Sequence, residues 1–321
     1  MKVAHWTLCN GSGMHRMAED LSFAEKALGV NSVLVQCDDG RQWELGVDAD
    51  VHVVHTHLPI VGKSGSKIVY VTHGTPEHVF QSSVEDGLQK GYGAGDPFML
   101  AYHWLKVSDA VVTWWPRAQA LWQQLCMKPK TVDLVPMGID LNFWRPIESR
   151  GRWSGAPSIF TAENCHYIKW PLDLVWMWSW VAQAVPGARL HMAYLPRDQH
   201  RWWYPLMYAS DAAFTSISTG NAFSWEDLRN AFSSVDYYIG LVRYGDFNRI
   251  CLEAKASGCK VISYAGNPYA DYWIPEGDQR TMAAELVKIL KGETAPRECQ
   301  TIQSRERMAE GIIAVYNRIC G

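Results

Sequence analysis

The chain has 321 residues, a formal net charge of −3, 48% hydrophobic residues and eight cysteines without a CxxC pair. This length is enough for two domains with separate cores, and the weak negative charge argues against a general nucleic-acid or membrane-surface protein. The cysteine spacing predicts neither a disulfide framework nor a zinc site. No apolar run approaches the roughly 20 residues that span a bilayer, and no signal-peptide pattern is found, so we expect a cytoplasmic protein without a transmembrane segment.

The N-terminus predicts a strand over residues 2–8, a glycine turn at 10–13 and a helix that continues to about residue 28. Gly11 and Gly13 would let a ligand approach the backbone of this turn. The third glycine of a dinucleotide fingerprint would fall at position 16, which is Arg16. Two interpretations stay open, a ligand-binding turn and a plain tight connection.

Three further short strands are predicted at 32–36, 51–57 and 67–73, and the last two end in histidines. Because carboxyl ends of parallel strands meet at one edge of a sheet, His55, His57 and His73 are candidates for ligand contact there. His73 is the strongest candidate, against the alternative of a histidine that only bonds to nearby backbone. As metal ligands, His55 and His57 lack a third partner at a recognisable spacing.

The middle of the chain predicts a loop at 82–97, a helix at 116–125 and a linker at 148–157. Beyond the linker, strands are predicted at 158–162, 189–195 and 235–242, with a helix at 172–185. Later helices are expected at 280–290 and 297–319. The alternation of strands and helices is typical of α/β domains with parallel sheets.

Residues 235–265 form the most informative stretch. An apolar strand, a short polar loop, a helix that ends at Gly258 and a second apolar strand predict a β-loop-α-β unit. The helix begins near Asn248, so its unpaired N–H groups would face the loop and favour an anionic group such as a diphosphate.

This stretch resembles the donor-site signature of the retaining GT-B glycosyltransferases of family 4, Glu-x-Phe-Gly-x-x-x-x-Glu-Ala-x-Ala-x-Gly-x-Pro-Val. The family's first Glu is replaced by Gly245, with Asp246 beside it, and its Pro is replaced by Lys260. Residues 131–146 are similar to the strand and turn that close the first domain of that family. The positions that agree with the donor-site signature are Phe247, Glu253, Ala254, Ala256, Gly258 and Val261.

The resemblance implies two Rossmann-like α/β domains facing across a cleft, with a C-terminal helix that crosses back to the first domain. The expected segments are an acceptor-side domain at 1–147, the linker at 148–157, a donor domain at 158–300 and the helix at 301–321.

The resemblance also assigns roles to individual residues. Glu253 would bind the donor ribose, and Lys169 would neutralise the donor diphosphate. Catalytic roles fall to His73 and Asp246. The remaining donor-binding candidates are Gly11, Gly13, Arg243, Phe247 and Asn248.

The expected function is transfer of a hexose or pentose from a UDP- or GDP-sugar to an acceptor hydroxyl, with retention and without a metal ion. The acceptor is a small molecule, a glycan or a modified base in DNA, although the negative net charge argues against DNA. Because Gly245 replaces the family's first Glu, a nucleotide-sugar binding protein without turnover remains the competing hypothesis.

Overall fold

The computed structural model describes residues 1–8, 13–37, 47–55, 65–90, 97–126, 130–148, 151, 153, 155–163, 171–193, 214–217, 223–243, 246 and 248–321. The chain divides into two compact units, Met1–Asp140 with Gln303–Gly321, and Leu141–Ile302. Each unit contains a six-stranded sheet whose paired strands are all parallel.

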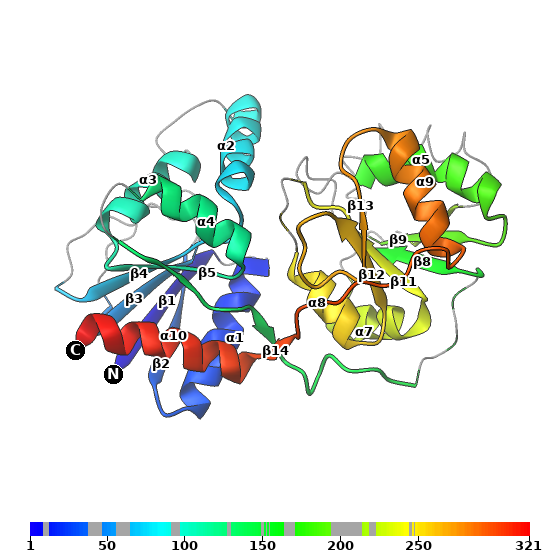
Figure 1. Cartoon of the computed structure of the whole chain (residues 1–321). Coiled ribbons are helices and arrows are strands. Elements are labelled where there is room, and N and C mark those ends of the chain that lie inside the picture. Colours follow the sequence, from blue (N-terminus) through cyan, green and yellow to red (C-terminus); the bar gives the residue numbers. More distant parts are fainter. Residues whose placement is uncertain are drawn as a thin grey trace. The chain divides into compact units, whose positions relative to one another are not determined.

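The N-terminal unit has the strand order β2-β1-β3-β4-β5-β6. Its helices α1 and α10 lie on one face of the sheet, and α2, α3 and α4 lie on the other (Figure 1). The strands are β1 (Lys2–Leu8), β2 (Asn31–Cys37), β3 (Val51–His55), β4 (Lys67–Val71), β5 (Ala110–Thr113) and β6 (Val132–Leu134). The helices are α1 (Gly13–Ala27), α2 (Pro76–Lys90), α3 (Pro97–Val107), α4 (Pro116–Leu125) and α10 (Arg305–Cys320).

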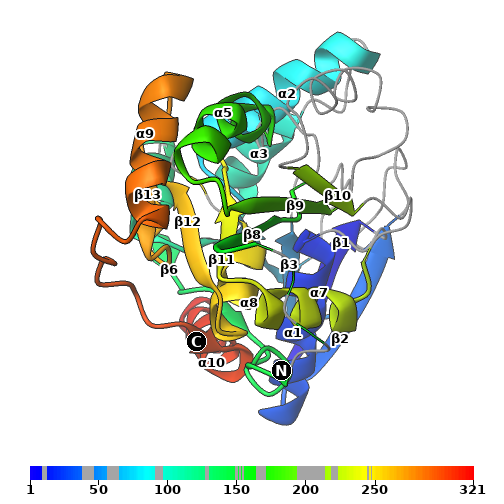
Figure 2. The ribbon, with the colours of Figure 1, turned by 90° about the vertical axis from the view of Figure 1, so that its right-hand side faces the viewer.

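The C-terminal unit has the strand order β10-β9-β8-β11-β12-β13. Figure 2 shows α5 and α9 on one face of this sheet and α7 and α8 on the other. The strands are β8 (Ser158–Thr161), β9 (Arg189–Ala193), β10 (Phe214–Ile217), β11 (Tyr237–Gly240), β12 (Lys260–Tyr264) and β13 (Tyr272–Ile274). The helices are α5 (Pro171–Ala184), α7 (Trp225–Ser234), α8 (Arg249–Ala256) and α9 (Gln279–Leu290).

Local sequence explains where many of these elements begin. Every residue of β5, β8 and β11 is buried, as expected of parallel strands that helices cover on both faces. Helices α2, α3, α4 and α5 start at a proline, whose fixed φ suits the first helical position and whose missing N–H would have no partner there. Helices α7, α9 and α10 have a side-chain cap instead, because the oxygen of Ser224, Asp278 or Ser304 accepts a hydrogen bond from the amide three residues ahead.

The core of the C-terminal unit lies between its sheet and the helices α5 and α9. Trp178 of α5 and Leu286 of α9 are fully buried against Ile239 and Ile262 of the central strands. Residues ahead of β8 also pack on this unit, since Trp144 lies 6.0 Å from Phe232, centroid to centroid. Burial of such large side chains stabilises a fold by about 1.5–3 kcal/mol each.

The C-terminal helix returns to the N-terminal unit through a two-stranded parallel pairing of β7 (Gly138–Ile139) with β14 (Gln303–Ser304). A Cβ atom on Gly138 would lie 2.2 Å from the carbonyl oxygen of Ser304, so the close approach of the two strands requires glycine. Arg305 then forms ion pairs with Asp20 at 3.3 Å and Asp140 at 3.0 Å. The predicted α/β architecture, including the returning helix, is confirmed.

Two sequence-based boundaries were wrong. The predicted loop at 82–97 lies partly in α2, which continues to Lys90 because Pro76 and the capping hydroxyl of Thr75 start a helix upstream of it. The last helix begins at Arg305 and not at residue 297, because the Ser304 hydroxyl accepts the Arg307 amide at 3.3 Å and caps the helix there.

Candidate active site

The carboxyl end of β4 carries the first candidate group. Beyond Val71 the chain passes through the half-buried His73 to Gly74. Gly74 has a φ of 136°, which residues with side chains rarely adopt, and its carbonyl oxygen accepts a hydrogen bond of 2.8 Å from Trp122 Nε1. This turn holds His73 at the sheet edge where open α/β sheets bind ligands.

His73 is the outer member of a hydrogen-bonded path of side chains, which we call the histidine path. His73 Nε2 lies 3.1 Å from His55 Nδ1, and His55 Nε2 lies 2.9 Å from His5 Nδ1. His5 Nε2 lies 2.7 Å from Glu25 Oε2, and the Tyr316 hydroxyl donates to Glu25 Oε1 at 2.9 Å. The four members inward of His73 are all fully buried.

Strand register brings the three histidines together. His5 lies opposite Val53 in the pairing of β1 with β3, so His5 and His55 point to the same face of the sheet. His55 lies opposite Val71 in the pairing of β3 with β4, and His73 comes two residues later, on the same side. Helices α1 and α10, which contact each other on this face, contribute the carboxylate and the tyrosine that complete the path (Figure 1).

The charges along the histidine path follow from burial and hydrogen bonding. Burial raises the pKa of Glu25, but the charge of His5 and hydrogen bonds from His5, Ser32 and Tyr316 outweigh it, so the pKa lies below its ordinary value. Burial, with repulsion from the neighbouring histidines, lowers the pKa of His55 well below its ordinary value. Burial and the nearby charge of Glu25 raise the pKa of Tyr316. Near neutral pH, Glu25 is therefore an anion, His55 is neutral and Tyr316 is a donor.

Another buried histidine lies on the opposite face of the same sheet. His52 precedes His55 by three residues in β3, so the two side chains alternate to opposite sides. Its Nδ1 accepts a hydrogen bond of 3.0 Å from Trp6 Nε1, and burial lowers its pKa. His52 is thus a buried, neutral histidine outside the histidine path.

A polar cluster centred on Asp173 lies at the carboxyl ends of β11 and β12 in the C-terminal unit. The buried Asp173 carboxylate accepts hydrogen bonds from Arg243 Nη2 at 2.9 Å, the Tyr264 hydroxyl at 2.7 Å and Gln279 Nε2 at 3.3 Å. Burial lowers the pKa of Arg243, but the hydrogen bond and charge of Asp173 outweigh it and raise the pKa overall. Asp173 therefore keeps a charged, 22% exposed guanidinium in place at this edge.

The buried Glu163 carboxylate, just beyond β8, occupies the same edge. Its Oε1 accepts a hydrogen bond of 2.9 Å from the Tyr238 hydroxyl, and its Oε2 accepts one from the amide of Asn248. Asn248 is the N-cap residue of α8; its side-chain Nδ2 donates to Glu163, and its side chain makes no cap bond. A Cβ on Gly240 would lie 2.9 Å from Cys251 Sγ and 3.3 Å from Glu163 Oε1, so glycine leaves room for both side chains.

Glu253, the expected ribose ligand, lies in α8 and is 2% exposed. Its Oε1 is 3.0 Å from Nε of Arg249, one helical turn earlier and also buried. Asp246 is 2% exposed, and its amide donates to the carbonyl of Arg243 at 3.4 Å. The structure therefore gathers Arg243, Asp246, Asn248 and Glu253 in the loop that follows β11 and in the helix that the loop begins.

The structure gives little information on the remaining candidate residues from the sequence. Gly13 is the first residue of α1. Gly11, His57, Lys169 and Phe247 lie outside the described residues.

Four buried polar residues of these clusters were missed from the sequence: His5, Glu25, Glu163 and Asp173. One signal was available, since Glu25 follows Leu21 by four residues and therefore lies on the apolar stripe of α1, where an unpaired carboxylate is unexpected. The partners of such a group come from other elements, so only the tertiary structure identifies them.

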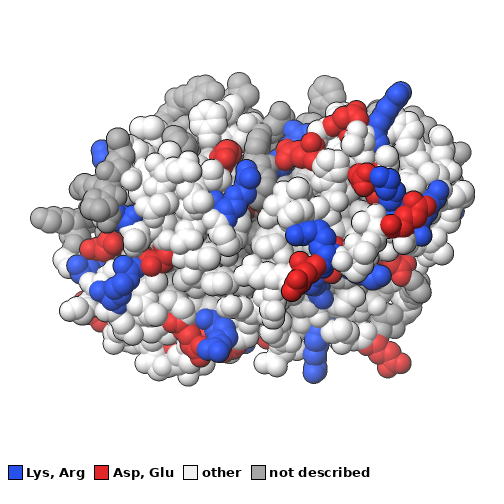
Figure 3. Space-filling model, in the orientation of Figure 1, with Lys and Arg blue, Asp and Glu red and all other residues white. Residues whose placement is uncertain are grey.

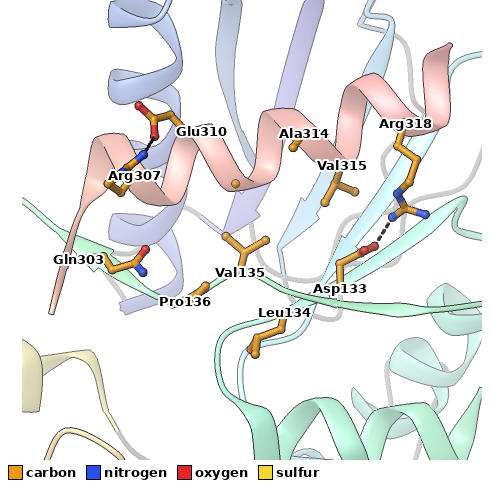
Figure 4. A pocket seen from close by; sticks show the side chains of 11 residues that line it. Asp133, Leu134, Val135, Pro136, Gln303, Arg307, Glu310, Ala314, Val315 and Arg318 are labelled. Carbon is orange, nitrogen blue, oxygen red and sulfur yellow. Dashed lines mark hydrogen bonds and ion pairs between the residues drawn. The ribbon is translucent and has the colours of Figure 1, made fainter. Parts of the chain in front are cut away.

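A pocket in the N-terminal unit lies between α10 and the chain segment that includes β6 (Figure 4). Its charged groups pair with one another, Arg318 with Asp133 and Arg307 with Glu310. Burial raises the pKa of Asp133, although Arg318 opposes this effect. The pair of Arg318 with Asp133 attaches α10 to β6, whereas the pair of Arg307 with Glu310 lies within α10, and we assign the pocket no ligand.

Within the described part of the chain, no group of three or more His, Cys, Asp or Glu side chains is placed to hold a metal ion. No described helix combines the length and the apolar character needed to cross a bilayer.

No protein-family model and no curated protein matches the chain significantly. Solved structures do match over the full length. A sucrose-phosphate synthase from Thermosynechococcus elongatus has a TM-score of 0.71 and 13% identity, covering 100% of this chain and 96% of its own. HepE from Anabaena, solved in complex with UDP-glucose, has a TM-score of 0.64 and 10% identity, covering 99% and 95%. A glycosyltransferase from Rickettsia africae has a TM-score of 0.60 and 11% identity, covering 99% and 98%.

At these identities the likeness establishes the architecture of the chain, and it extends over both units. The protein has the GT-B fold, with two Rossmann-like α/β domains and a C-terminal helix that belongs to the first.

Proposed function

We propose that this protein is a glycosyltransferase of the family 4 type, which moves a sugar from a nucleotide-sugar donor to an acceptor hydroxyl with retention. The observation that carries the proposal is the full-length likeness to solved glycosyltransferases, one of them in complex with UDP-glucose. Because HepE was solved in complex with UDP and with UDP-glucose, a UDP-sugar is the first donor to test, ahead of a GDP-sugar.

The C-terminal unit would hold the donor. Glu253 accepts hydrogen bonds from the ribose hydroxyls, and the ion pair with Arg249 holds its carboxylate at 3.0 Å in one orientation. Arg243, which Asp173 fixes, and Lys169 neutralise the diphosphate together with the amino end of α8. Charge stabilisation of this kind needs no bound metal ion.

The N-terminal unit would receive the acceptor. His73 lies at the carboxyl end of β4, where it could contact the transferred sugar or an acceptor hydroxyl. Asp246, next to the position of the family's first Glu, would orient the sugar. The acceptor is a small molecule or a glycan.

Two alternatives use the same fold. A modified base in DNA as acceptor would need clustered cations, whereas on the face drawn in Figure 3 basic and acidic side chains lie interspersed. A binding protein without turnover is favoured by Gly245, which replaces the family's first Glu.

The test is calorimetric titration of the protein with UDP, UDP-sugars and GDP-sugars, followed by assay of nucleoside diphosphate release with hydroxyl acceptors. Glu253→Gln should weaken donor binding about 10- to 150-fold, because hydrogen bonds to a charged acceptor contribute about 1.5–3 kcal/mol. Glu285→Gln, which removes an exposed carboxylate of α9 paired with Lys288, is the matched control.

Three outcomes separate the alternatives. Binding with transfer, followed by an NMR spectrum in which the product keeps the donor's anomeric configuration, supports the full proposal. Binding without transfer to any acceptor supports the binding protein. Equal donor affinity in wild type and Glu253→Gln would overturn the assignment of Glu253.

A further inference from the structure

The outer face of α5 carries tryptophans where a surface helix ordinarily carries polar side chains. Trp176 and Trp180 are each 40% exposed, and they are neighbours on the helix surface because they are four residues apart. Trp178, which lies between them in the sequence, is fully buried in the core of the C-terminal unit. Two large apolar rings side by side in contact with water are unfavourable, so the pair indicates that a ligand or a partner binds to this face.

Polar groups with unused hydrogen-bonding capacity lie beside the two tryptophans. Helix α9 packs against α5 (Figures 1 and 2), and Cζ of Arg280 in α9 lies 5.6 Å from the centroid of the Trp180 ring. Gln183 is exposed and follows Trp180 by three residues, on the same side of α5. Within the described part of the chain, the side chains of Arg280 and Gln183 make no hydrogen bond. We call Trp176, Trp180, Gln183 and Arg280 the indole platform.

The chemistry of the indole platform fits a sugar ring. A pyranose ring presents C–H groups on its faces, which can pack on an indole, and its hydroxyls project from the rim. A sugar on Trp180 would bring these hydroxyls to Arg280, which has five N–H donors, and to the Gln183 amide, which both donates and accepts. One side of the ligand is therefore served by apolar contact and the other by hydrogen bonds.

The size of the apolar surface argues against a protein partner. A tryptophan side chain has about 150–250 Å² of surface, so an exposure of 40% leaves about 60–100 Å² on each of the two rings. The pair thus offers roughly 120–200 Å², whereas a stable protein–protein interface buries about 800 Å² on each partner. The apolar part of the platform is too small for such an interface, but it suits one sugar ring on each indole.

The charge of the surroundings argues against a nucleic acid, whose bases also stack on aromatic rings. Helix α5 contains no lysine or arginine. Asp278 lies close to Arg280, since hydrogen bonds from Thr281 and, more weakly, the charge of Arg280 lower the pKa of the Asp278 carboxyl. Binding of a polyanion needs clustered cations, and here a single guanidinium stands near a carboxylate.

We propose that the indole platform is a binding site for a neutral glycan, in which sugar rings stack on Trp176 and Trp180 and their hydroxyls bond to Arg280 and Gln183. The proposal concerns binding alone. It involves none of the residues that the proposed function assigns to the donor or to catalysis, so the two can be tested separately.

The first experiment detects the site by 1H–15N NMR of the full-length protein, with maltohexaose, cellohexaose and chitohexaose as probes. The indole N–H signals of Trp176 and Trp180 are assigned from Trp176→Phe and Trp180→Phe, which each lose one signal. We expect at least one probe to shift the Trp180 signal in a saturable way. Trp273 is the internal control: it is 37% exposed, but Arg297 already lies over its ring at 3.2 Å and its Nε1 donates to the Asn267 carbonyl, so its signal should stay in place.

The second experiment measures the affinity of variants for the probe that binds. Trp180→Ala should weaken binding about 5-fold or more, the factor that one stacking contact on an aromatic side chain contributes. Arg280→Gln should weaken it about 2- to 10-fold, because it removes hydrogen bonds from the guanidinium. Trp273→Phe should bind as wild type does. If Trp180→Ala does not fold, the wild-type titration and Arg280→Gln still decide the question.

Three results would overturn the proposal. The first is a Trp180 signal that none of the three probes shifts at millimolar concentration, and the second is equal affinity in wild type and Trp180→Ala. The third is a shift with a single-stranded oligothymidylate but with no glycan, which would assign the platform to nucleic acid. None of these measurements needs a sugar donor, so glycan binding would support the site even if the transfer assay refuted the proposed function.

Discussion

Acid should destabilise the N-terminal unit through two buried histidines of β3. His52 and His55 of β3 are buried and have lowered pKa values in the folded state. In the unfolded chain both histidines are exposed and have pKa values near the ordinary 6.5. Between pH 6.5 and the lower pKa of the folded state, the unfolded chain therefore binds more protons than the native protein. Stability is therefore fully present above about pH 6.5 and is lost as the pH falls below it.

The size of the effect follows from proton linkage. For a group that stays neutral in the folded state, lowering the pH from about 7.5 to 5.5 across an unfolded pKa of 6.5 costs about 1.4 kcal/mol. The pKa of His55 lies well below 6.5, so it contributes about this amount. His52 contributes a part of the same free energy. We expect the unit to lose between about 1.4 and 2.7 kcal/mol over this range.

Native-state hydrogen exchange of peptides from β1 and β3 measures the opening free energy of this unit separately from the other. The loss between pH 7.5 and 5.5 should be smaller in His55→Gln than in wild type by about 1.4 kcal/mol. His103→Gln, which removes an exposed histidine from α3, is the control and should match wild type. An opening free energy that does not fall on acidification, or an equal loss in wild type and His55→Gln, would refute the claim that His55 is buried and neutral.

Two other variants test the packing. Gly138→Ala places a Cβ about 2.2 Å from the Ser304 carbonyl oxygen and should lower the free energy of unfolding by about 1–3 kcal/mol, measured as a lower melting temperature. The control Gly65→Ala has open space around the new Cβ and should leave the melting temperature unchanged. Asp173→Asn removes the charged acceptor of Arg243 and should lower the free energy of unfolding, measured in urea, by about 1.5–3 kcal/mol. An unchanged midpoint of urea unfolding would show that the Asp173–Arg243 pair contributes nothing to stability.

The order and type of the elements could largely be predicted from the sequence. The helix at 116–125 and the strands that begin at residues 2, 51, 67 and 158 agree with α4, β1, β3, β4 and β8. Buried parallel strands and proline-started helices have strong local patterns, which do not depend on partners. Boundaries that depend on a cap or on a helix of mixed composition were less accurate, as α2 and α10 show.

The sequence alone determined the α/β class, the position of His73 at a strand end and the β-loop-α-β unit around Glu253, because each depends on periodicity and on residues near in the chain. Tertiary structure alone decided the partners of the buried polar groups. Glu25 meets His5 at a separation of 20 residues and Tyr316 at 291. Strand register and the packing face of each helix determine these contacts, and neither can be read from the local composition of the sequence. The histidine path could therefore be identified only from the folded chain.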